Sequence, residues 1–364
     1  MTPEELSARL RRVFEGRNAP ERILLMNTDN PDPNFFYLTG FTSGLFEYSY
    51  IVADKASVKL FTSALEYDTA LQQKVRGIEV IKIDDIKAFR SQMRGLLINS
   101  TIGVNEWFVP YAIYESIQKR YKPKKTVDVS KRLSNARLVK SIGEVKAIRK
   151  AVGITKWAQM LIQKEFKEGM TEMELAARFD SISASLGSEG PSFKTIVCFG
   201  ANAALPHHSP DRTRLRYGDF ILIDAGAKVQ NYCSDITRTS IFGTDKSRIP
   251  DCEKKQEMLR IVKDAQLAAL RKIAPGVTGL TIHMEAQRTI DTAANGRYKG
   301  TFIHALGHSL GIEVHDGPGF SPGAKQELEP GMVITNEPGI YVEGFGGVRI
   351  EDDILVTEKG AEVL

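Results

Sequence analysis

DFILIDAGAKVQNYCSDITRTSIF, residues 219–242, is the stretch that decides the fold. Its first apolar run, Phe220–Ile223, predicts a buried strand, and Tyr232–Phe242 predicts a second strand after a polar interval. A turn near Val229-Gln230 would join them as an antiparallel hairpin. The stretch therefore indicates strand pairs in this part of the chain.

The two strands carry one aspartate each, Asp224 and Asp235. They are symmetric about the expected turn, and residues that face each other across a strand pair lie roughly 4.5 to 5.5 Å apart. Two carboxylates that face each other among apolar strands repel and are poorly solvated. They need protons, basic partners or a metal ion. The alternative is one structural aspartate at a turn and one exposed aspartate.

A second acidic pair repeats this pattern near the C-terminus. Glu337 lies in Val333–Gly339 and Glu351 in Val348–Asp353, with a glycine-rich turn between them. Symmetry about Gly344 places Glu337 opposite Glu351. Two hairpins that each present a facing acid pair are not typical of solvent-exposed surface acids. Four convergent carboxylates suit hard or borderline divalent cations.

Histidines add nitrogen donors to this set. FIHALGHSLGIEVHD, residues 302–316, holds His304, His308 and His315, and its two glycines argue against a regular helix. One imidazole added to four carboxylates makes a ligand set for two metal ions. For any single histidine of the three, a structural role is the alternative.

A further histidine pair, His207 and His208, ends the segment GANAALPHH, residues 200–208, and is expected on a loop. Pairs of this kind are often surface residues. Five of the six histidines nevertheless fall in motif-like segments. His283 lies in an ordinary helical pattern and is interpreted as structural.

The rest of the chain predicts two domains, 1–132 and 133–364, with a polar and basic linker over Asp128–Ser141. The first reads as mixed α/β, and the second interleaves helices with antiparallel strands, an α+β pattern. Thr171 and Glu174 form an expected capping box. The expected strands of the first part are Arg22–Asn27, Phe46–Val52, Val58–Thr62, Ile78–Ile83 and Ile102–Asn105, and its helices are Leu65–Lys74 and Pro110–Tyr121. The expected helices of the second part are Ile142–Phe166, Glu172–Leu186, Pro250–Ile273 and Leu280–Ala294.

Composition bounds the class of protein. The chain has 364 residues, 42% hydrophobic and 26% charged, with a net charge of +4 and three cysteines. These values are typical of a globular protein in a reducing compartment. They favour neither a nucleic-acid nor a membrane partner, because the charge is balanced and no apolar run approaches the roughly 18 residues that span a bilayer.

Met1–Phe14 has no signal-peptide pattern, and the basic run Lys119–Lys125 is interpreted as a solvated turn. We expect a cytoplasmic protein.

The order of the metal-ligand candidates resembles that of the dinuclear metallopeptidases of the methionine aminopeptidase and prolidase superfamily, which have the pita-bread fold. The candidates are Asp224, Asp235, His308, Glu337 and Glu351, and the motifs around them are FKTIVCFGANAALPH (193–207), DAG (224–226), SDITRT (234–239), GH (307–308), VHD (314–316), EPG (337–339) and RIED (349–352). The resemblance covers residues 136–364. NFFYLTGF (34–41) and RLVKSIGE (137–144) extend it to Xaa-Pro dipeptidases and Xaa-Pro aminopeptidases, which carry a smaller creatinase-like N-terminal domain.

The resemblance implies a role for each ligand. Asp224 would chelate one metal ion, His308 and Glu337 would hold the other, and Asp235 and Glu351 would bridge both. A metal-bridged water or hydroxide would be the nucleophile, and Glu337 the proton shuttle. The implied metals are two divalent ions per subunit, Mn²⁺ or Co²⁺ first, with Zn²⁺ or Fe²⁺ as alternatives.

Other site residues follow from the same resemblance. His207, His315 and Tyr341 would line the pocket on the proline side, where the histidines can donate to the oxyanion or to the substrate's C-terminal part. His304 and Arg349 would orient substrate or ligands. Thr237 would hydrogen-bond near the metal ions.

The implied reaction is hydrolysis of Xaa-Pro bonds, in dipeptides or at the N-terminus of longer peptides, and a homodimer is the implied assembly. The sequence leaves those two substrate classes open. Alternatives are a non-catalytic binding or regulatory protein on the same scaffold, a methionine-aminopeptidase-like activity, and a dinuclear hydrolase for another amide or a phosphoester. Phe35, Phe36 and Tyr37 are expected either at an aromatic rim of the site or in a core.

Overall fold

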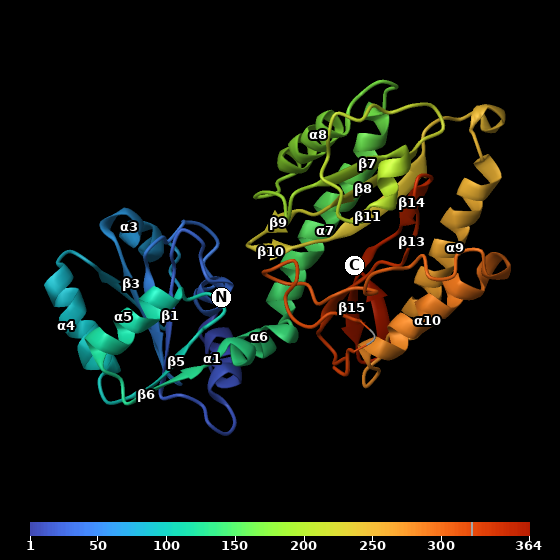
Figure 1. Ribbon diagram of the computed structural model, residues 1–364. Helices are drawn as coiled ribbons and strands as arrows, with labels where there is room; N and C mark the ends of the chain where they lie inside the picture. The colour runs from blue at the N-terminus through green and yellow to red at the C-terminus, as the bar shows by residue number, and fades with distance from the viewer. Residues whose placement is uncertain (322) are drawn as a thin grey trace. The chain divides into compact units, whose positions relative to one another are not determined.

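A computed structural model describes residues 1–321 and 323–364. The chain forms two compact units, Met1–Arg137 and Leu138–Leu364 (Figure 1). The expected division after residue 132 falls inside helix α6 (Ser130–Leu138). The linker expected over this stretch is therefore wrong in conformation. The segment is polar overall, but Leu133 and Ala136, one helical turn apart, are buried and hold it as a helix.

The N-terminal unit is built on one six-stranded sheet with the order β4-β3-β2-β1-β5-β6, in which β2 pairs antiparallel with β1 and β3 and the other pairings are parallel. Its strands are β1 (Arg22–Met26), β2 (Tyr50–Ala53), β3 (Val58–Thr62), β4 (Ile78–Lys82), β5 (Thr101–Val104) and β6 (Lys125–Asp128). Its other helices are α1 (Pro3–Phe14), α2 (Pro33–Thr39), α3 (Ala64–Gln72), α4 (Ile86–Leu97) and α5 (Tyr111–Tyr121).

Two details of this unit differ from expectation or decide an alternative. Strand β2 begins at Tyr50 rather than Phe46, because Phe46 and Tyr48 have positive φ angles, which an extended strand does not accommodate. The aromatic run lies on α2, where Phe35 and Tyr37 are fully buried. These two aromatic residues therefore belong to the core of the unit.

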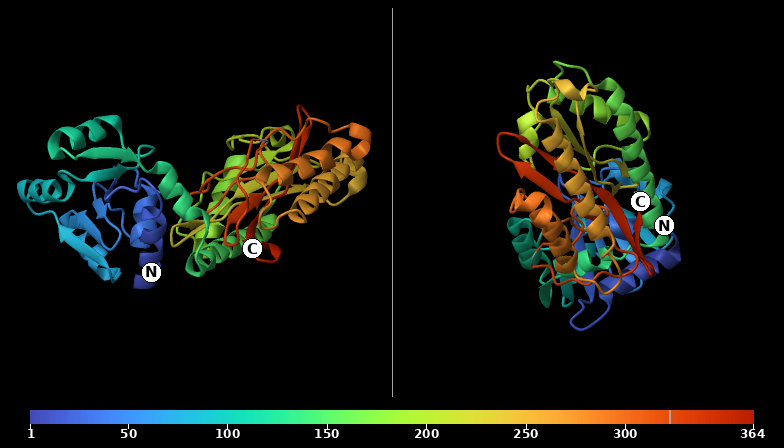
Figure 2. Two further views of the ribbon diagram at one scale, coloured as in Figure 1. Left: turned by 90° about the horizontal axis from the view of Figure 1, so that it is seen from below. Right: turned by 90° about the vertical axis from the view of Figure 1, so that its right-hand side faces the viewer.

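Four helices, all expected from the sequence, frame the C-terminal unit. They are α7 (Ile142–Ile162), α8 (Glu172–Ser185), α9 (Cys252–Leu270) and α10 (Gly279–Thr292). The capping box of Thr171 and Glu174 is confirmed, and Ser141 with Glu144 forms another at the start of α7. Figure 2 shows α9 and α10 side by side along one face of the unit. Among the described residues, no helix combines the length and the apolar character needed to cross a bilayer.

The strands of this unit form small antiparallel sheets. One has the order β11-β8-β7, another β12-β15-β16, and two-stranded ladders join β9 with β10 and β13 with β14. The strands are β7 (Ile196–Phe199), β8 (Phe220–Ala225), β9 (Lys228–Val229), β10 (Tyr232–Cys233), β11 (Ile236–Ile241), β12 (Val333–Asn336), β13 (Gly339–Val342), β14 (Gly346–Arg349), β15 (Asp352–Thr357) and β16 (Gly360–Val363).

Strand β8 is buried on both faces and separates two core clusters. Ile221 and Ile223 pack in a cluster with side chains of α7 and α8. Phe220 and Leu222 pack in the cluster that includes α9 and α10. Because successive side chains of a strand alternate between faces, Asp224 lies on the face of Phe220 and Leu222. The core thus aims this carboxylate toward the C-terminal strands.

The register of the first hairpin corrects the expected facing pair. Asp224 pairs with Thr237, not with Asp235, because the turn lies at Gln230 and Asn231, both of which have positive φ angles. Asp235 lies in the gap between β10 and β11, two residues before Thr237, and so shares its face. The two aspartates are diagonal neighbours rather than a direct cross-strand pair.

The second hairpin has the expected register. Ile340 pairs with Val348, and Asn336 pairs with Asp352, so both ladders are symmetric about Gly344. Glu337 and Glu351 occupy the corresponding positions between these ladders.

Candidate functional site

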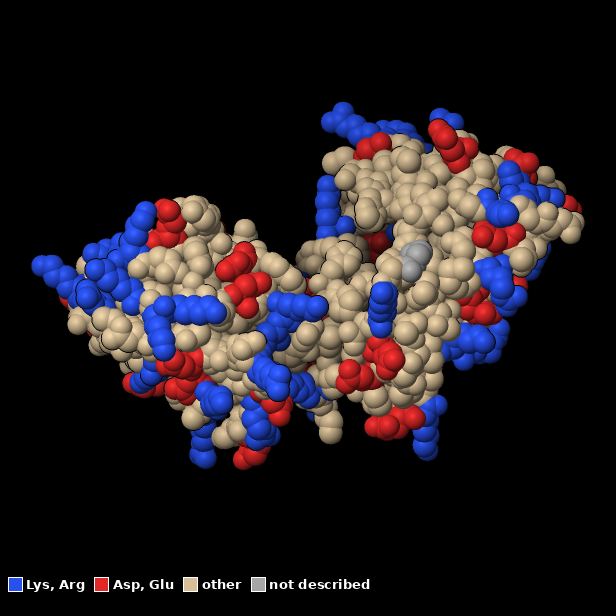
Figure 3. All heavy atoms as spheres, turned by 60° about the horizontal axis from the view of Figure 1, so that its bottom comes forward, with Lys and Arg blue, Asp and Glu red and all other residues tan. Residues whose placement is uncertain are grey.

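A cavity of about 820 Å³ in the C-terminal unit collects most of the expected site residues. His207, Asp224, Asp235, His304, His308, His315, Glu337 and Arg349 line it. Figure 3 shows acidic atoms recessed in a hollow on one face of this unit. Tyr341 and Glu351 are buried. Tyr341 contacts the site through a hydrogen bond to the lining residue His304, and Glu351 accepts a hydrogen bond from Thr237.

Carboxylates and one imidazole converge at the bottom of the cavity. Single ligand atoms of Asp235, His308 and Glu351 all lie within 4.8 Å of one another. His308 Nε2 is 3.5 Å from Asp235 Oδ2 and 3.6 Å from Glu337 Oε1. His308 Nδ1 lies 3.2 Å from the carbonyl oxygen of Ser309, and this contact assigns the proton to Nδ1. The Nε2 lone pair is then directed at the acids.

Several buried oxygens of this cluster accept no hydrogen bond within the described residues. They are Oδ1 of Asp224, Oδ1 of Asp235 and Oε1 of Glu351. A buried anionic oxygen without a partner is costly. Three such atoms in one place, beside a neutral imidazole nitrogen, are the donor set that a divalent cation satisfies.

The electrostatics of the cluster agree with this interpretation. Burial, reinforced by the neighbouring acids, raises the pKa of Asp235 and Glu351 well above their usual values. Burial also raises the pKa of Glu337, to about 8. Burial lowers the pKa of His308 to about 4, so the imidazole is neutral at pH 7 and its Nε2 can bind a metal ion.

Arg349 organises one side of the site from strand β14. Its guanidinium donates to Asp224 Oδ2 at 2.7 Å, to the Tyr341 hydroxyl at 2.8 Å and to Thr237 Oγ1 at 3.0 Å. The Thr237 hydroxyl in turn donates to Glu351 Oε2 at 2.7 Å. One buried cation therefore ties two of the acids into a single hydrogen-bonded chain.

His304 and Tyr341 continue that chain. His304 Nδ1 is 2.7 Å from the carbonyl oxygen of Ala305, so it carries the proton, and Nε2 accepts from the Tyr341 hydroxyl at 2.8 Å. Burial lowers the pKa of His304 to about 4 and raises that of Tyr341 to about 12. Both groups are neutral at pH 7 and act as hydrogen-bonding partners rather than charges.

The remaining histidines divide into two groups. His207 and His315 are exposed on the cavity wall, and the ring of His315 lies edge-on to that of His308 at 4.2 Å between centroids. His208 instead contacts Glu172 through Nε2 at 2.7 Å. His283 is buried against Phe302, which agrees with the structural role expected for it.

Two supporting residues were not expected from the sequence. Asp353 Oδ2 accepts the backbone N–H of Asp235 at 3.0 Å. The Thr335 hydroxyl accepts the backbone N–H of His308 at 3.0 Å and donates to Glu337 Oε1 at 3.2 Å. Each stands two positions from a ligand candidate on the same segment, Asp353 from Glu351 and Thr335 from Glu337. The strand period of two could therefore have found both.

The chain matches known proteins along nearly its whole length. The model for metallopeptidase family M24 matches residues 146–358, and that for the creatinase/prolidase N-terminal domain matches residues 17–139. A Xaa-Pro dipeptidase of Pyrococcus horikoshii is 35% identical over 351 residues, covering 96% of this chain and 94% of that protein.

Solved structures agree. A Xaa-Pro dipeptidase from Bacillus anthracis has a TM-score of 0.88 at 30% identity and covers 100% of this chain and 97% of its own. An X-Pro aminopeptidase from Thermotoga maritima has a TM-score of 0.86 at 32% identity, with coverages of 94% and 95%. The expected fold, a creatinase-like N-terminal domain followed in the sequence by an α+β pita-bread domain, is confirmed. The chain belongs to metallopeptidase family M24 and carries a creatinase/prolidase N-terminal domain.

Proposed function

We propose that the protein hydrolyses the bond between an N-terminal residue and a following proline. The observation that carries the proposal is the cluster of buried, unpartnered carboxylate oxygens around the neutral His308 in a cavity large enough for a small peptide. The relatives named Xaa-Pro dipeptidase and X-Pro aminopeptidase support the substrate class.

Two divalent metal ions belong to the proposal, because the donor set fits them. Asp224 would hold one ion, His308 and Glu337 the other, and Asp235 and Glu351 would contact both. Bound divalent ions supply Lewis-acid polarisation of the scissile carbonyl and acidify a water molecule. Carboxylate-rich ligation with one imidazole suits Mn²⁺ or Co²⁺, and also Zn²⁺ or Fe²⁺.

The protein's own residues position the peptide and move protons. Glu337 can take a proton at Oε1 and pass it to the proline nitrogen. The Thr335 hydroxyl, which donates to Oε1, orients this carboxylate. His207 and His315 offer ring N–H donors to the developing oxyanion or to the C-terminal part of the peptide. The bond before proline has no N–H that a protease could recognise by a hydrogen bond. A site that acts on the carbonyl group and on the proline nitrogen does not need that N–H.

A direct assay tests this proposal. With added Mn²⁺ or Co²⁺, the enzyme should cleave Ala-Pro or Ala-Pro-Ala, and the preference between them separates a dipeptidase from an aminopeptidase. Cleavage of Met-Ala-Ser alone would instead establish a methionine-aminopeptidase-like activity. A metal-loaded protein that cleaves none of the three would revive a binding or regulatory role. The proposed homodimer is measured separately by light scattering.

A further inference from the structure

The catalytic cavity contains two cationic side chains among its described lining residues, Lys228 and Arg349. Arg349 is buried, and each nitrogen of its guanidinium donates to a residue of the site. It is therefore engaged in holding Asp224 and Tyr341. Of the two, Lys228 is thus the cationic side chain that is available to pair with an anionic group of a substrate, in addition to the proposed metal ions.

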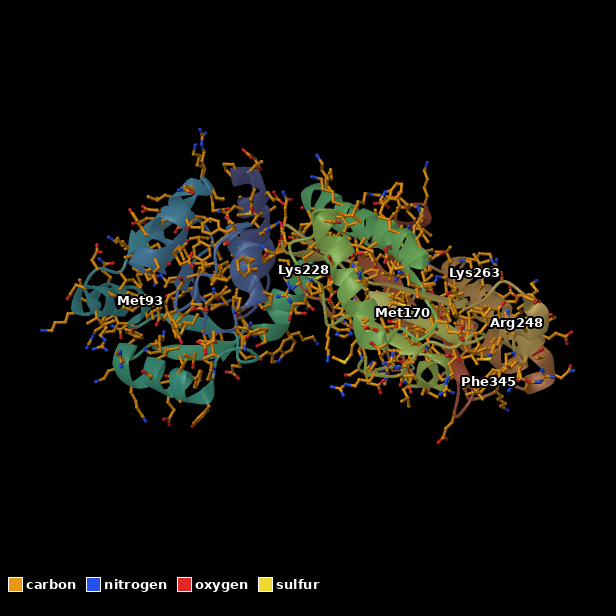
Figure 4. All side chains as sticks on the ribbon, turned by 90° about the horizontal axis from the view of Figure 1, so that it is seen from above. Met93, Met170, Lys228, Arg248, Lys263 and Phe345 are labelled. Atoms are coloured by element: carbon orange, nitrogen blue, oxygen red, sulfur yellow. The ribbon has the colours of Figure 1, made fainter. Side chains whose placement is uncertain are left out.

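The backbone of Lys228 is firmly held. Lys228 of strand β9 pairs with Cys233 of strand β10. The backbone N–H of Lys228 donates to the carbonyl oxygen of Gly190 at 3.0 Å and to Ser188 Oγ at 3.2 Å. Its own carbonyl oxygen accepts the N–H of Glu189 at 2.9 Å. The side chain therefore projects from a fixed point on the cavity wall. Figure 4 labels it among the side chains of the C-terminal unit.

The ammonium group, in contrast, has no counter-ion among the side chains that the structure describes. Within residues 1–321 and 323–364 it makes no ion pair and no hydrogen bond. The residue is half-buried, and Cys233, its partner across the β9–β10 ladder, is buried. A partly desolvated cation attracts an anion more strongly than it would in bulk water.

We infer that Lys228 pairs with a carboxylate of the bound peptide and so determines which Xaa-Pro substrates are preferred. The inference rests on the proposed peptidase function and adds a charge requirement to it. The carboxylate comes from one of two sources. It is the side chain of an acidic first residue, or it is the free C-terminus that proline carries in a dipeptide.

Two substrate ratios distinguish the sources. The first compares kcat/KM for Glu-Pro and Gln-Pro, which differ in side-chain charge at constant shape. The second compares Ala-Pro with Ala-prolinamide, which lacks the C-terminal charge. The metal-loaded enzyme should favour the charged member of at least one pair by about tenfold, the size of one charge-assisted contact.

Variants assign that preference to Lys228. Lys228→Met should bring the ratio to near one, and Lys228→Arg should restore it. Lys272→Met, which removes an exposed lysine outside the cavity lining, is the matched control and should keep the wild-type ratio. Calorimetric affinities for the same peptides, measured on the Glu337→Gln background, give a readout that does not depend on turnover.

Each outcome is decisive. A ratio that collapses in Lys228→Met and returns in Lys228→Arg supports the inference and names the source of the carboxylate. Cleavage or binding with the same two ratios in wild type and Lys228→Met overturns the inference but leaves the peptidase function intact. No cleavage and no binding of any of the four peptides overturns the proposed function and this inference with it.

Discussion

At the scale of single residues, Arg349 hydrogen-bonds to more residues of the site than its expected role of orienting substrate or ligands requires. Its guanidinium reaches Asp224, Tyr341 and Thr237 at once, a geometry that the planar fork of arginine allows and a lysine ammonium does not. It supplies positive charge beside Asp224 even when no metal ion is bound. We infer that it holds the empty ligand set together.

Replacing Arg349 tests this role. Arg349→Met should lower the free energy of unfolding of the metal-free protein by about 3 kcal/mol, because it leaves Asp224 without its buried partner. Arg349→Lys keeps the charge and should lose less. Urea denaturation at pH 7 measures both. Arg288→Met, which breaks an exposed ion pair with Glu285, is the control and should cost about 0.5 kcal/mol or less. Equal losses in Arg349→Met and Arg288→Met would contradict the role.

Asp235 offers a second test at this scale, since asparagine preserves its shape but removes its charge. Asp235→Asn should lose at least one metal ion per chain in elemental analysis. Peptidase activity should fall at least about a hundredfold, since even residues that merely orient a ligand contribute tenfold to a hundredfold. Asp264→Asn, an exposed aspartate on α9, should keep both ions. A fully active Asp235→Asn enzyme would refute its role as a ligand.

At the scale of elements, glycines explain why the ligand segments can approach one another. A Cβ on Gly226 would lie 1.8 Å from the carbonyl oxygen of Ser234, and a Cβ on Gly307 would lie 2.2 Å from that of Thr335. Gly226 follows Asp224 by two residues, and Gly307 directly precedes His308. The segments that carry the candidate ligands are thus in backbone contact, which any larger residue prevents.

Gly307→Ala should therefore separate His308 from Glu337. We expect a loss of roughly 1 to 3 kcal/mol in unfolding free energy, the usual cost of overpacking, together with reduced metal occupancy. The matched control is Gly153→Ala in the interior of α7, where nothing lies within 4 Å of the added Cβ. That variant should be more stable by about 0.5 to 1 kcal/mol. Urea denaturation and metal analysis of both variants provide the check, and full metal occupancy in Gly307→Ala would count against close approach as the reason for this glycine.

The elements also show what the sequence could predict. The hairpin about Gly344 was predicted in register, because its glycines mark the turn and its symmetry is unbroken. The first hairpin was misplaced, because its turn uses Gln230 and Asn231, of which Gln230 is not a usual residue for positive φ angles. The observed partner of Asp224, Thr237, lies two residues beyond the expected partner, Asp235. Because side chains alternate between the faces of a strand, a shift of two residues keeps both aspartates on one face. The candidate ligands therefore still lie together, although the expected partner of Asp224 was wrong.

At the scale of the whole molecule, sequence patterns predicted which segments meet at the candidate site but not how their charges are balanced. Helix α6 was missed because its buried Leu133 and Ala136 are few among polar residues. Nor could the sequence predict that Lys228 has no ion-pair partner among the described residues, or that Arg349 is already bonded to Asp224. Pairing of charges depends on tertiary contacts, which a linear pattern does not encode.

The acid cluster makes the stability of the metal-free protein depend on pH. The pKa values of Asp235, Glu337 and Glu351 are raised in the fold, so these groups favour the folded state fully only below their unfolded pKa of about 4. That contribution is lost as the pH rises through the folded-state values, which for Glu337 is about 8. His308, with a pKa lowered to about 4 in the fold, acts in the opposite sense up to its unfolded pKa of about 6.5, because in that range only the unfolded chain binds the proton. The trend set by the acids is therefore unopposed by His308 only above about pH 7.

The melting temperature of the metal-stripped protein should therefore fall between about pH 7 and pH 8.5, while that of the Mn²⁺-loaded protein changes less, because the cations neutralise the same carboxylates. Differential scanning calorimetry with chelator or with Mn²⁺ measures the gap between the two forms. Removing two of the charges in the double variant Asp235→Asn, Glu351→Gln should flatten the pH dependence of the stripped protein, and Asp264→Asn should not. A gap that stays constant or narrows with rising pH would show that these carboxylates are not the groups that the metal ions neutralise.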